Sequence, residues 1–153
     1  MRIAFFQPDI AQNAGTIIRL GACVNIGVDI IEPCGFMFNE KALKRAGMDY
    51  IEQCDYKKHI SWDAFLEHKE ANPEEYGRII LLTTKASVNY TKFEFKENDV
   101  LLLGRESKGV PQEVHDIVDG RVIIPMTEHA RSLNVAISGA MVLSEALRQI
   151  NQI

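Results

Sequence analysis

A short charged loop between two glycines is the stretch of this sequence best suited to binding or chemistry. It follows the apolar run 99–104 and reads Gly-Arg-Glu-Ser-Lys-Gly over residues 104–109. It is neither a phosphate-binding P-loop nor a dinucleotide fingerprint, because no Gly-Lys-Ser/Thr follows and Glu106 stands where a second close-packed glycine is needed. Glu106 is therefore expected to accept hydrogen bonds from hydroxyl, arginine or backbone N–H groups, while Gly104 lets a neutral part of a ligand approach closely. The alternative is a charged surface turn.

A second candidate site opens a helix near the N-terminus. Asn13, Gly15 and Arg19 lie in the stretch "QNAGTIIR", and Asn13 is predicted to cap the helix. Arg19 then lies nearly two turns further on, where its five-donor guanidinium could reach a phosphate or a ribose. A helix N-terminus with a nearby arginine suits an anion. The alternative is a simple cap followed by a surface arginine.

A third candidate site precedes the last helix. Pro125 ends an apolar run, and the polar residues Arg131, Ser132 and Asn134 lead into the apolar, helix-like stretch 133–152. Ser132 is either a functional residue of this loop or simply the predicted N-cap of the helix. His129 is a weaker candidate for a catalytic base, because an isolated loop histidine is more often simply solvated.

The elements that must position these loops alternate between strands and helices. The two runs 78–84 and 99–104 are continuously apolar, which is typical of parallel strands covered on both faces. This pattern predicts an α/β domain with a mainly parallel sheet flanked by helices, in which ligands sit beyond the carboxyl ends of the strands. Strands are expected at 2–6, 27–33, around 50–56, 78–84, 99–104 and 121–125, and helices from Asn13, between Asn39 and Gly47, from Ser61 to Pro73, from Pro111 and over 133–152.

Length and composition predict one compact domain over residues 1–153. Hydrophobic residues make up 46% of the 153 residues and charged residues 25%, which is typical of globular chains. No apolar run reaches the roughly 18–20 residues of a membrane helix, and the N-terminus turns polar too early for a signal peptide, so a cytoplasmic protein is expected. The three cysteines have neither a paired spacing nor a histidine-rich surrounding, which favours reduced structural thiols over a metal site.

The net charge argues against a protein that binds nucleic acid through a large overall positive charge. The net charge is −4, although a local basic patch remains compatible with it. The segment "NEKALKRAG", residues 39–47, carries Lys41, Lys44 and Arg45 against the single acid Glu40. It is either such a patch or an ordinary solvated helix face.

Taken together and in order, the three loops resemble the motifs of the SPOUT RNA methyltransferases. The resemblance rests on Asn13, Gly15 and Arg19, on "LLLGRESKGVP" and on "RSLNVAISGAMVLSEALRQ", and it covers nearly the whole chain. Within this class the sequence is most similar to the TrmL type, which methylates the ribose 2′-oxygen of the wobble nucleotide, position 34, of tRNA, a cytidine or a modified uridine. The resemblance implies a C-terminal deep trefoil knot, a homodimer with the active site at its interface, S-adenosylmethionine as cofactor and the tRNA anticodon stem-loop as partner.

The resemblance also implies roles for individual residues. Leu133 is a departure, since relatives can carry methionine there, and an apolar swap of similar volume should be tolerated. Ser132 belongs to both the cofactor and the substrate positions. The remaining cofactor positions are Leu82, Thr83, Gly104, Ile124 and Leu133, and the catalytic and substrate positions are Asn13, Arg19, Glu106 and Asn134.

The implied reaction is an in-line displacement by the ribose oxygen on a sulfonium methyl. It needs no metal, because the leaving group is a neutral thioether. Arg19 is expected to clamp the neighbouring phosphate and stabilise the developing alkoxide rather than act as a base, since a guanidinium is almost never deprotonated in a protein. A phosphate oxygen or Glu106 would take the proton. The alternatives are an enzyme of this class with another tRNA position or ribosomal RNA as substrate, and a binding module without catalysis.

Overall fold

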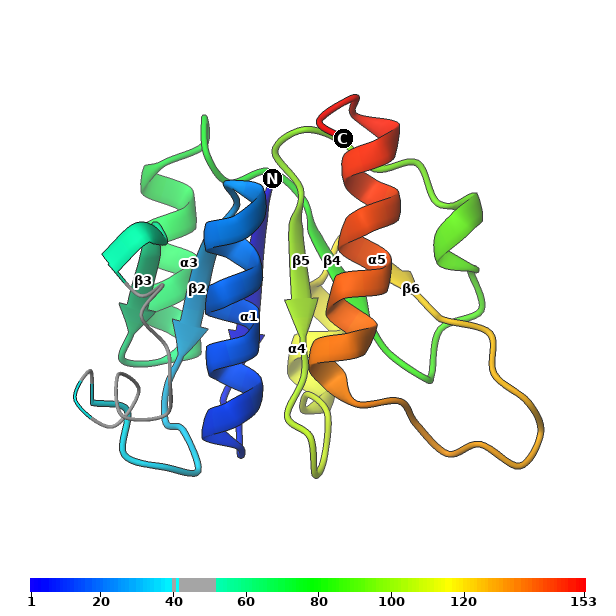
Figure 1. Cartoon of the computed structure of the whole chain (residues 1–153), viewed down its shortest axis with the longest axis horizontal. Helices are drawn as coiled ribbons and strands as arrows, with labels where there is room; N and C mark the ends of the chain where they lie inside the picture. The colour runs from blue at the N-terminus through cyan, green and yellow to red at the C-terminus, as the bar shows by residue number, and fades with distance from the viewer. Residues whose placement is uncertain (40, 42–51) are drawn as a thin grey trace.

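The protein is described by a computed structural model for residues 1–39, 41 and 52–153. Six parallel strands form a single sheet in the order β3-β2-β1-β5-β4-β6, and helices cover both of its faces (Figure 1). The predicted α/β class with a mainly parallel sheet is therefore confirmed. The elements are β1 Arg2–Phe6, α1 Ala11–Val24, β2 Gly27–Ile31, β3 Tyr56–His59, α3 Trp62–Ala71, β4 Ile79–Leu82, η2 Tyr90–Lys92, β5 Val100–Leu103, α4 Gln112–Ile117, β6 Gly120–Val122 and α5 Val135–Gln149.

The strands divide their apolar side chains between two buried layers. In β1, Ile3 and Phe5 point into the layer beneath α1 and α5, whereas Ala4 and Phe6 point into the layer that contains residues of α3 and α4. Residues of β5 divide between the two layers in the same alternating way. Because both faces are covered, the strands can be apolar at every position, which explains their continuous apolar runs.

The sheet order places the loops after β1 and β5 beside each other. β1 lies between β2 and β5, and Phe5 is in register with Ile30 on one side and with Leu103 on the other. From β1 the chain proceeds through α1 to β2, and from β5 it proceeds through α4 toward β6 on the other side. Such a reversal of direction opens a crevice at the carboxyl ends of the two strands.

Two predicted helix caps were wrong. Helix α1 begins at Ala11 after Ile10, so Asn13 lies inside its first turn and is buried. Helix α5 begins at Val135, and its cap is Asn134 rather than Ser132: the Asn134 side-chain oxygen accepts hydrogen bonds from the backbone N–H groups of Ala136 (2.9 Å) and Ile137 (3.2 Å). The predicted cap at Ser61 is confirmed, since its hydroxyl accepts from the Ala64 N–H (3.1 Å).

The third strand, the helix expected after Asn39 and the cysteines were also predicted from the sequence. The third strand spans Tyr56–His59 and so begins where the predicted strand 50–56 ended. The short helix predicted between Asn39 and Gly47 falls on residues 40 and 42–51, which lie outside the described part of the chain. The cysteines are free thiols, as predicted. Burial raises the pKa of Cys34 and of Cys54 to about 11, so both stay protonated at neutral pH.

Within residues 1–39, 41 and 52–153, no helix combines the length and apolar character that crossing a bilayer requires.

Candidate active site

A cavity of about 400 Å³ lies beyond the carboxyl ends of the strands, where the crevice was expected. The loop and first helical turn after β1, the turn after β5 and the chain that runs from β6 into α5 line it, together with the segment after β4. The predicted cofactor positions all come together here. They are Leu82, Thr83, Gly104, Ile124, Ser132 and Leu133.

The predicted catalytic residue Glu106 also lines the cavity and joins two of the three loops. Its Oε2 accepts a hydrogen bond from the Asp9 N–H (2.7 Å), and its Oε1 accepts from the Ile10 N–H (3.2 Å) and from the Asn13 side-chain amide (3.0 Å). The expectation that Glu106 accepts from backbone N–H groups is therefore met, and Asn13 is a further donor. Three of the roughly four acceptor directions of this carboxylate are occupied.

Asn13 and Asn134 extend this connection to the third loop. The Asn134 Nδ2 donates to the Asn13 Oδ1 (3.0 Å), while the Asn13 Nδ2 donates to Glu106. The Asn134 Oδ1 caps α5, which fixes the direction of its amide. One continuous chain of hydrogen bonds thus links Glu106, Asn13 and Asn134, the predicted residues from the three motifs.

A second connection between the loops involves residues that the sequence did not single out. The Asp9 Oδ2 accepts hydrogen bonds from both the backbone N–H (3.0 Å) and the hydroxyl (2.7 Å) of Ser107. These bonds hold the pKa of Asp9 below its ordinary value. The Asp9 carboxylate therefore binds the turn after β5, and the Glu106 carboxylate of that turn binds the Asp9 N–H in the loop after β1.

The turn that carries Glu106 closes on its own backbone. Arg105 and Gly109 exchange two backbone hydrogen bonds (3.1 and 2.9 Å), and Gly109 has a φ of +65°. A Cβ at Gly104 would lie 2.8 Å from the Cα of Gly109. The close approach that requires glycine at position 104 is therefore made within the turn itself.

Among the predicted catalytic and cofactor positions, Arg19 is the one that does not line the cavity, and the weaker candidate His129 does not line it either. Arg19 lies on α1 and is exposed, whereas Asn13 and Glu106 line the cavity. Sequence reasoning also missed several lining residues. Ile10, Arg105, Met126 and Ser138 are among these. Each lies within four residues of a predicted site residue, and this proximity is the signal that could have found them.

Comparison with known proteins identifies the class of this site. The SpoU rRNA Methylase family matches residues 1–144 of the chain. The chain therefore belongs to this family of RNA methyltransferases, the class with which its sheet and its three-loop cavity agree. Membership of this family implies that the C-terminal segment is threaded into a trefoil knot.

Two named enzymes and one solved structure are similar to nearly the whole chain. The chain is 49% identical to the tRNA (cytidine(34)-2′-O)-methyltransferase of Ancylobacter novellus over 97% of its length and 92% of the relative's. It is 50% identical to the enzyme of the same name from Beijerinckia indica, again over 97% of this chain and 91% of the relative. It is also similar to a solved structure from work on 2′-OH methylation of C/U34 on tRNA, with 36% identity, a TM-score of 0.88 and coverage of 99% and 97%.

A further structural relative was solved with its cofactor. It is an rRNA methyltransferase from Sinorhizobium meliloti with bound AdoMet, which is S-adenosylmethionine. The identity is 25% and the TM-score 0.84, and the match covers 97% of this chain and 56% of the relative.

Proposed function

We propose that this protein transfers a methyl group from S-adenosylmethionine to the ribose 2′-oxygen of nucleotide 34, the wobble cytidine or a modified uridine, in tRNA. The observation that carries the proposal is the assembly of all three motif loops around one cavity in a chain about half identical, over nearly its full length, to enzymes named for this reaction. Residues 1–153 would act as a single domain in the cytoplasm.

The cavity has the properties that a cofactor of this size needs. About 400 Å³ lies within the usual range for small-molecule sites, and the lining combines apolar side chains with a few polar groups. Leu82, Ile124 and Leu133 would supply apolar contact, and Thr83 and Ser132 would supply hydrogen bonds. When bound, S-adenosylmethionine supplies an electrophilic sulfonium methyl.

The hydrogen-bonded motif residues would hold the reacting groups in line. Positioning of this kind can supply several kcal/mol of a barrier. Because the oxygens of Glu106 already accept three hydrogen bonds, we assign Glu106 the role of fixing Asn13 and the loop after β1. The proton of the ribose hydroxyl would then pass to a phosphate oxygen of the RNA. Asn134 would orient Asn13 and the start of α5.

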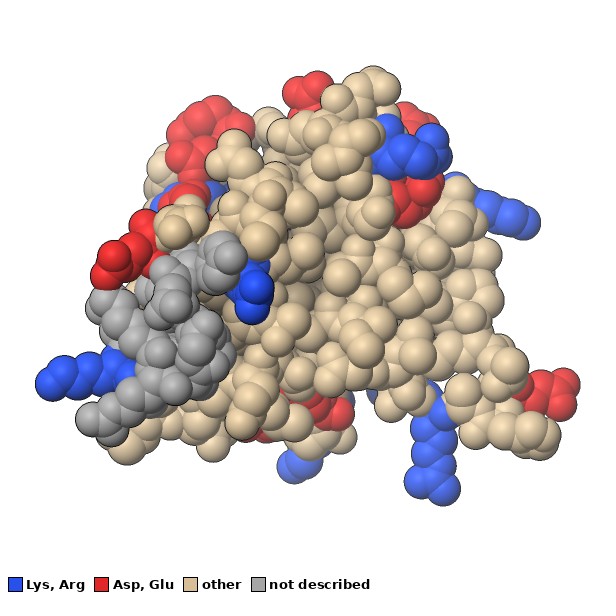
Figure 2. Space-filling model, viewed as in Figure 1, with Lys and Arg blue, Asp and Glu red and all other residues tan. Residues whose placement is uncertain are grey.

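A homodimer would complete the site. Arg19 is exposed on α1, away from the cavity of its own chain. Its clamp on a phosphate therefore fits an active site at a subunit interface, where one protomer's Arg19 meets the other's cavity. The face covered by α1 and α5 supports such an interface, because its charged side chains lie mainly at the edges (Figure 2). On α5 this face exposes Ile137 (57%) and Met141 (38%).

The partner surface for the anticodon stem-loop is expected to be small. Lys41 of the basic segment is exposed, whereas Lys44 and Arg45 lie outside the described residues. With a net charge of −4, few phosphate contacts are expected, and so a shallow dependence of tRNA affinity on salt.

Labelled methyl transfer tests the proposal directly. Wild-type protein, labelled S-adenosylmethionine and total tRNA from a strain that lacks this gene should give label that maps to the 2′-oxygen of nucleotide 34. Arg19→Ala should abolish transfer, and Arg19→Lys should fail to restore it if the forked guanidinium matters. Label at another tRNA position or in ribosomal RNA would overturn the substrate, and tight cofactor binding without any transfer would overturn catalysis.

A further inference from the structure

Arg105 lines the cavity, and its side chain forms no hydrogen bond with the described residues. Its Nε is buried and has no hydrogen-bond partner among the described residues. Its guanidinium instead lies over the Phe6 ring, 5.5 Å from the ring centroid. A buried donor left without a partner costs on the order of 1–3 kcal/mol, so such groups in native proteins call for an explanation.

The position of this guanidinium is fixed by what packs around it. Phe6 is itself held edge-on against Trp62, with ring centroids 5.7 Å apart. The backbone N–H groups of Arg105 and Gly109 each donate a hydrogen bond to the carbonyl oxygen of the other residue. The side chain is therefore pre-oriented by an aromatic surface and a closed turn, which lowers the entropy cost of using it to bind a ligand.

Two acids of the neighbouring loop and turn, Asp9 and Glu106, already accept hydrogen bonds from other groups. Asp9 attracts Arg105 electrostatically, but its Oδ2 accepts both hydrogen bonds of Ser107. The Glu106 carboxylate accepts from Asn13 and from two backbone N–H groups. Within the described part of the chain, neither carboxylate forms an ion pair with Arg105, so its forked donors are available to an oxyanion from outside.

We propose that Arg105 binds a phosphate of the RNA next to the ribose that is methylated. This inference rests on the proposed function, because an RNA that presents a 2′-oxygen to this cavity carries a phosphate on the neighbouring 3′ position. A guanidinium matches a phosphate through two parallel hydrogen bonds. Arg105 is half-buried where it lines the cavity, and the exposed Lys108 follows on the same turn, so the pair faces an incoming polyanion.

The test compares Arg105→Ala and Arg105→Lys with a matched control, Lys96→Ala. Lys96 is exposed and precedes β5, at the opposite end of that strand from the cavity, so its removal changes the net charge equally. Three quantities are measured for each variant: the KM and kcat for tRNA, the tRNA Kd as a function of salt, and the Kd for S-adenosylmethionine. Thermal unfolding checks that each variant is folded.

Arg105→Ala should raise the tRNA KM about tenfold and reduce the slope of log K against log salt by about 1, with cofactor affinity within about twofold of wild type. Arg105→Lys should restore the salt slope but only part of the KM, because it keeps the charge and loses the fork. Lys96→Ala should match wild type in all three.

Two results with the Arg105 variants would overturn the proposal. Unchanged tRNA affinity and salt slope would mean that Arg105 only packs on Phe6. A loss of cofactor affinity alone would assign its partner to the carboxylate of S-adenosylmethionine. If the wild type binds tRNA but transfers no methyl group, the proposed function fails, and the salt slopes still decide the role of Arg105. If the wild type binds no RNA, both proposals fail.

Discussion

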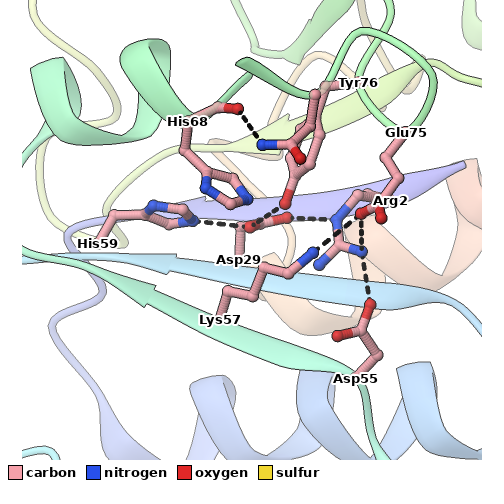
Figure 3. Close-up of polar contacts among 9 residues, drawn as sticks. Arg2, Asp29, Asp55, Lys57, His59, His68, Glu75 and Tyr76 are labelled. Atoms are coloured by element: carbon pink, nitrogen blue, oxygen red, sulfur yellow. Dashed lines mark hydrogen bonds and ion pairs between the residues drawn. The ribbon is translucent and has the colours of Figure 1, made fainter. Parts of the chain in front are cut away.

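Two polar networks of this molecule are built from different groups and lie on different parts of the sheet. One centres on the carboxylate of Asp29 in β2, which is fully buried. It accepts hydrogen bonds from Arg2 Nε (2.7 Å) and the Tyr76 hydroxyl (2.8 Å) and lies 2.7 Å from the His59 Nε2, as Figure 3 shows. The other joins Glu106, Asn13 and Asn134 at the cavity, and most of its contacts are only partly buried.

The two networks differ in what they use as donors. Around Asp29 the donors are side chains, including a guanidinium, and Arg2 also reaches Asp55 (2.6 Å) at the exposed edge. Around Glu106 the donors are backbone N–H groups and one amide. A buried charge without its partner is costly, whereas a partly exposed N–H group can turn to water. The first network should therefore govern stability, and the second should govern the geometry of the reaction.

Removing the centre of the first network should have the largest effect. Asp29→Ala leaves the buried Arg2 without its main counter-ion and removes the acceptor of Tyr76 and His59. The expected loss is about 3–5 kcal/mol of the free energy of unfolding, measured by urea denaturation. Glu74→Ala, at an exposed acid, should stay within about 0.5 kcal/mol of wild type. If the two variants unfolded at the same urea concentration, the Asp29 network would carry no stability.

Breaking the second network should affect the reaction more than the fold. Glu106→Ala frees the loop after β1 and the Asn13 amide, so kcat/KM for tRNA should fall about 100-fold. The free energy of unfolding should change by only about 1–2 kcal/mol. Methyl-transfer kinetics and urea denaturation on the same preparation measure both.

Glu106→Gln separates this positioning role from proton transfer. The amide keeps one acceptor oxygen, so a positioning residue should retain part of the activity, with an unchanged pH–rate profile. A variant that binds cofactor normally, is as inactive as Glu106→Ala and loses a limb of that profile would instead identify Glu106 as the base.

The contrast also explains which features the sequence could predict. Strands covered on both faces give continuous apolar runs, so β4 and β5 could be placed from the sequence, and the parallel class followed from them. The motif residues Asn13, Glu106 and Asn134 were predicted through a family resemblance, and the cavity brings them together. The network around Asp29 could not be predicted, because its partners are 27 to 47 residues away and meet only through the order of the strands.

The wrong cap of α5 has a local physical cause. Ser132 and Asn134 are both good cap residues, and only the backbone conformation decides where α5 begins. The buried side of α5 is also hard to recognise in the sequence. It includes the small residues Ala136, Gly139 and Ala146, while Ile137 on the same helix is exposed. Small residues permit close packing but give a weak periodic signal.

Low pH should affect the two regions to different extents, through Asp29 in the first network and through Asp9, whose carboxylate holds Ser107 beside the second. Burial alone would raise the pKa of Asp29, but hydrogen bonds from His59 and the charge of Arg2 outweigh it and lower that pKa. The pKa of Asp9 is lowered chiefly by its hydrogen bonds with Ser107. A carboxylate with a lowered folded-state pKa stabilises the protein above its unfolded pKa, near 3.9, and loses that contribution as the pH falls through the folded value.

The free energy of unfolding of wild type should therefore fall as the pH drops below about 4, measured by urea denaturation from pH 6 to pH 2. Asp29→Asn should remove much of this dependence, because no carboxylate remains to be protonated. Asp9→Asn should remove less, since solvent screens the partly exposed Asp9. Equal slopes for the two variants would mean that burial does not distinguish these carboxylates, and the division between a stability network and a site network would fail at this pair.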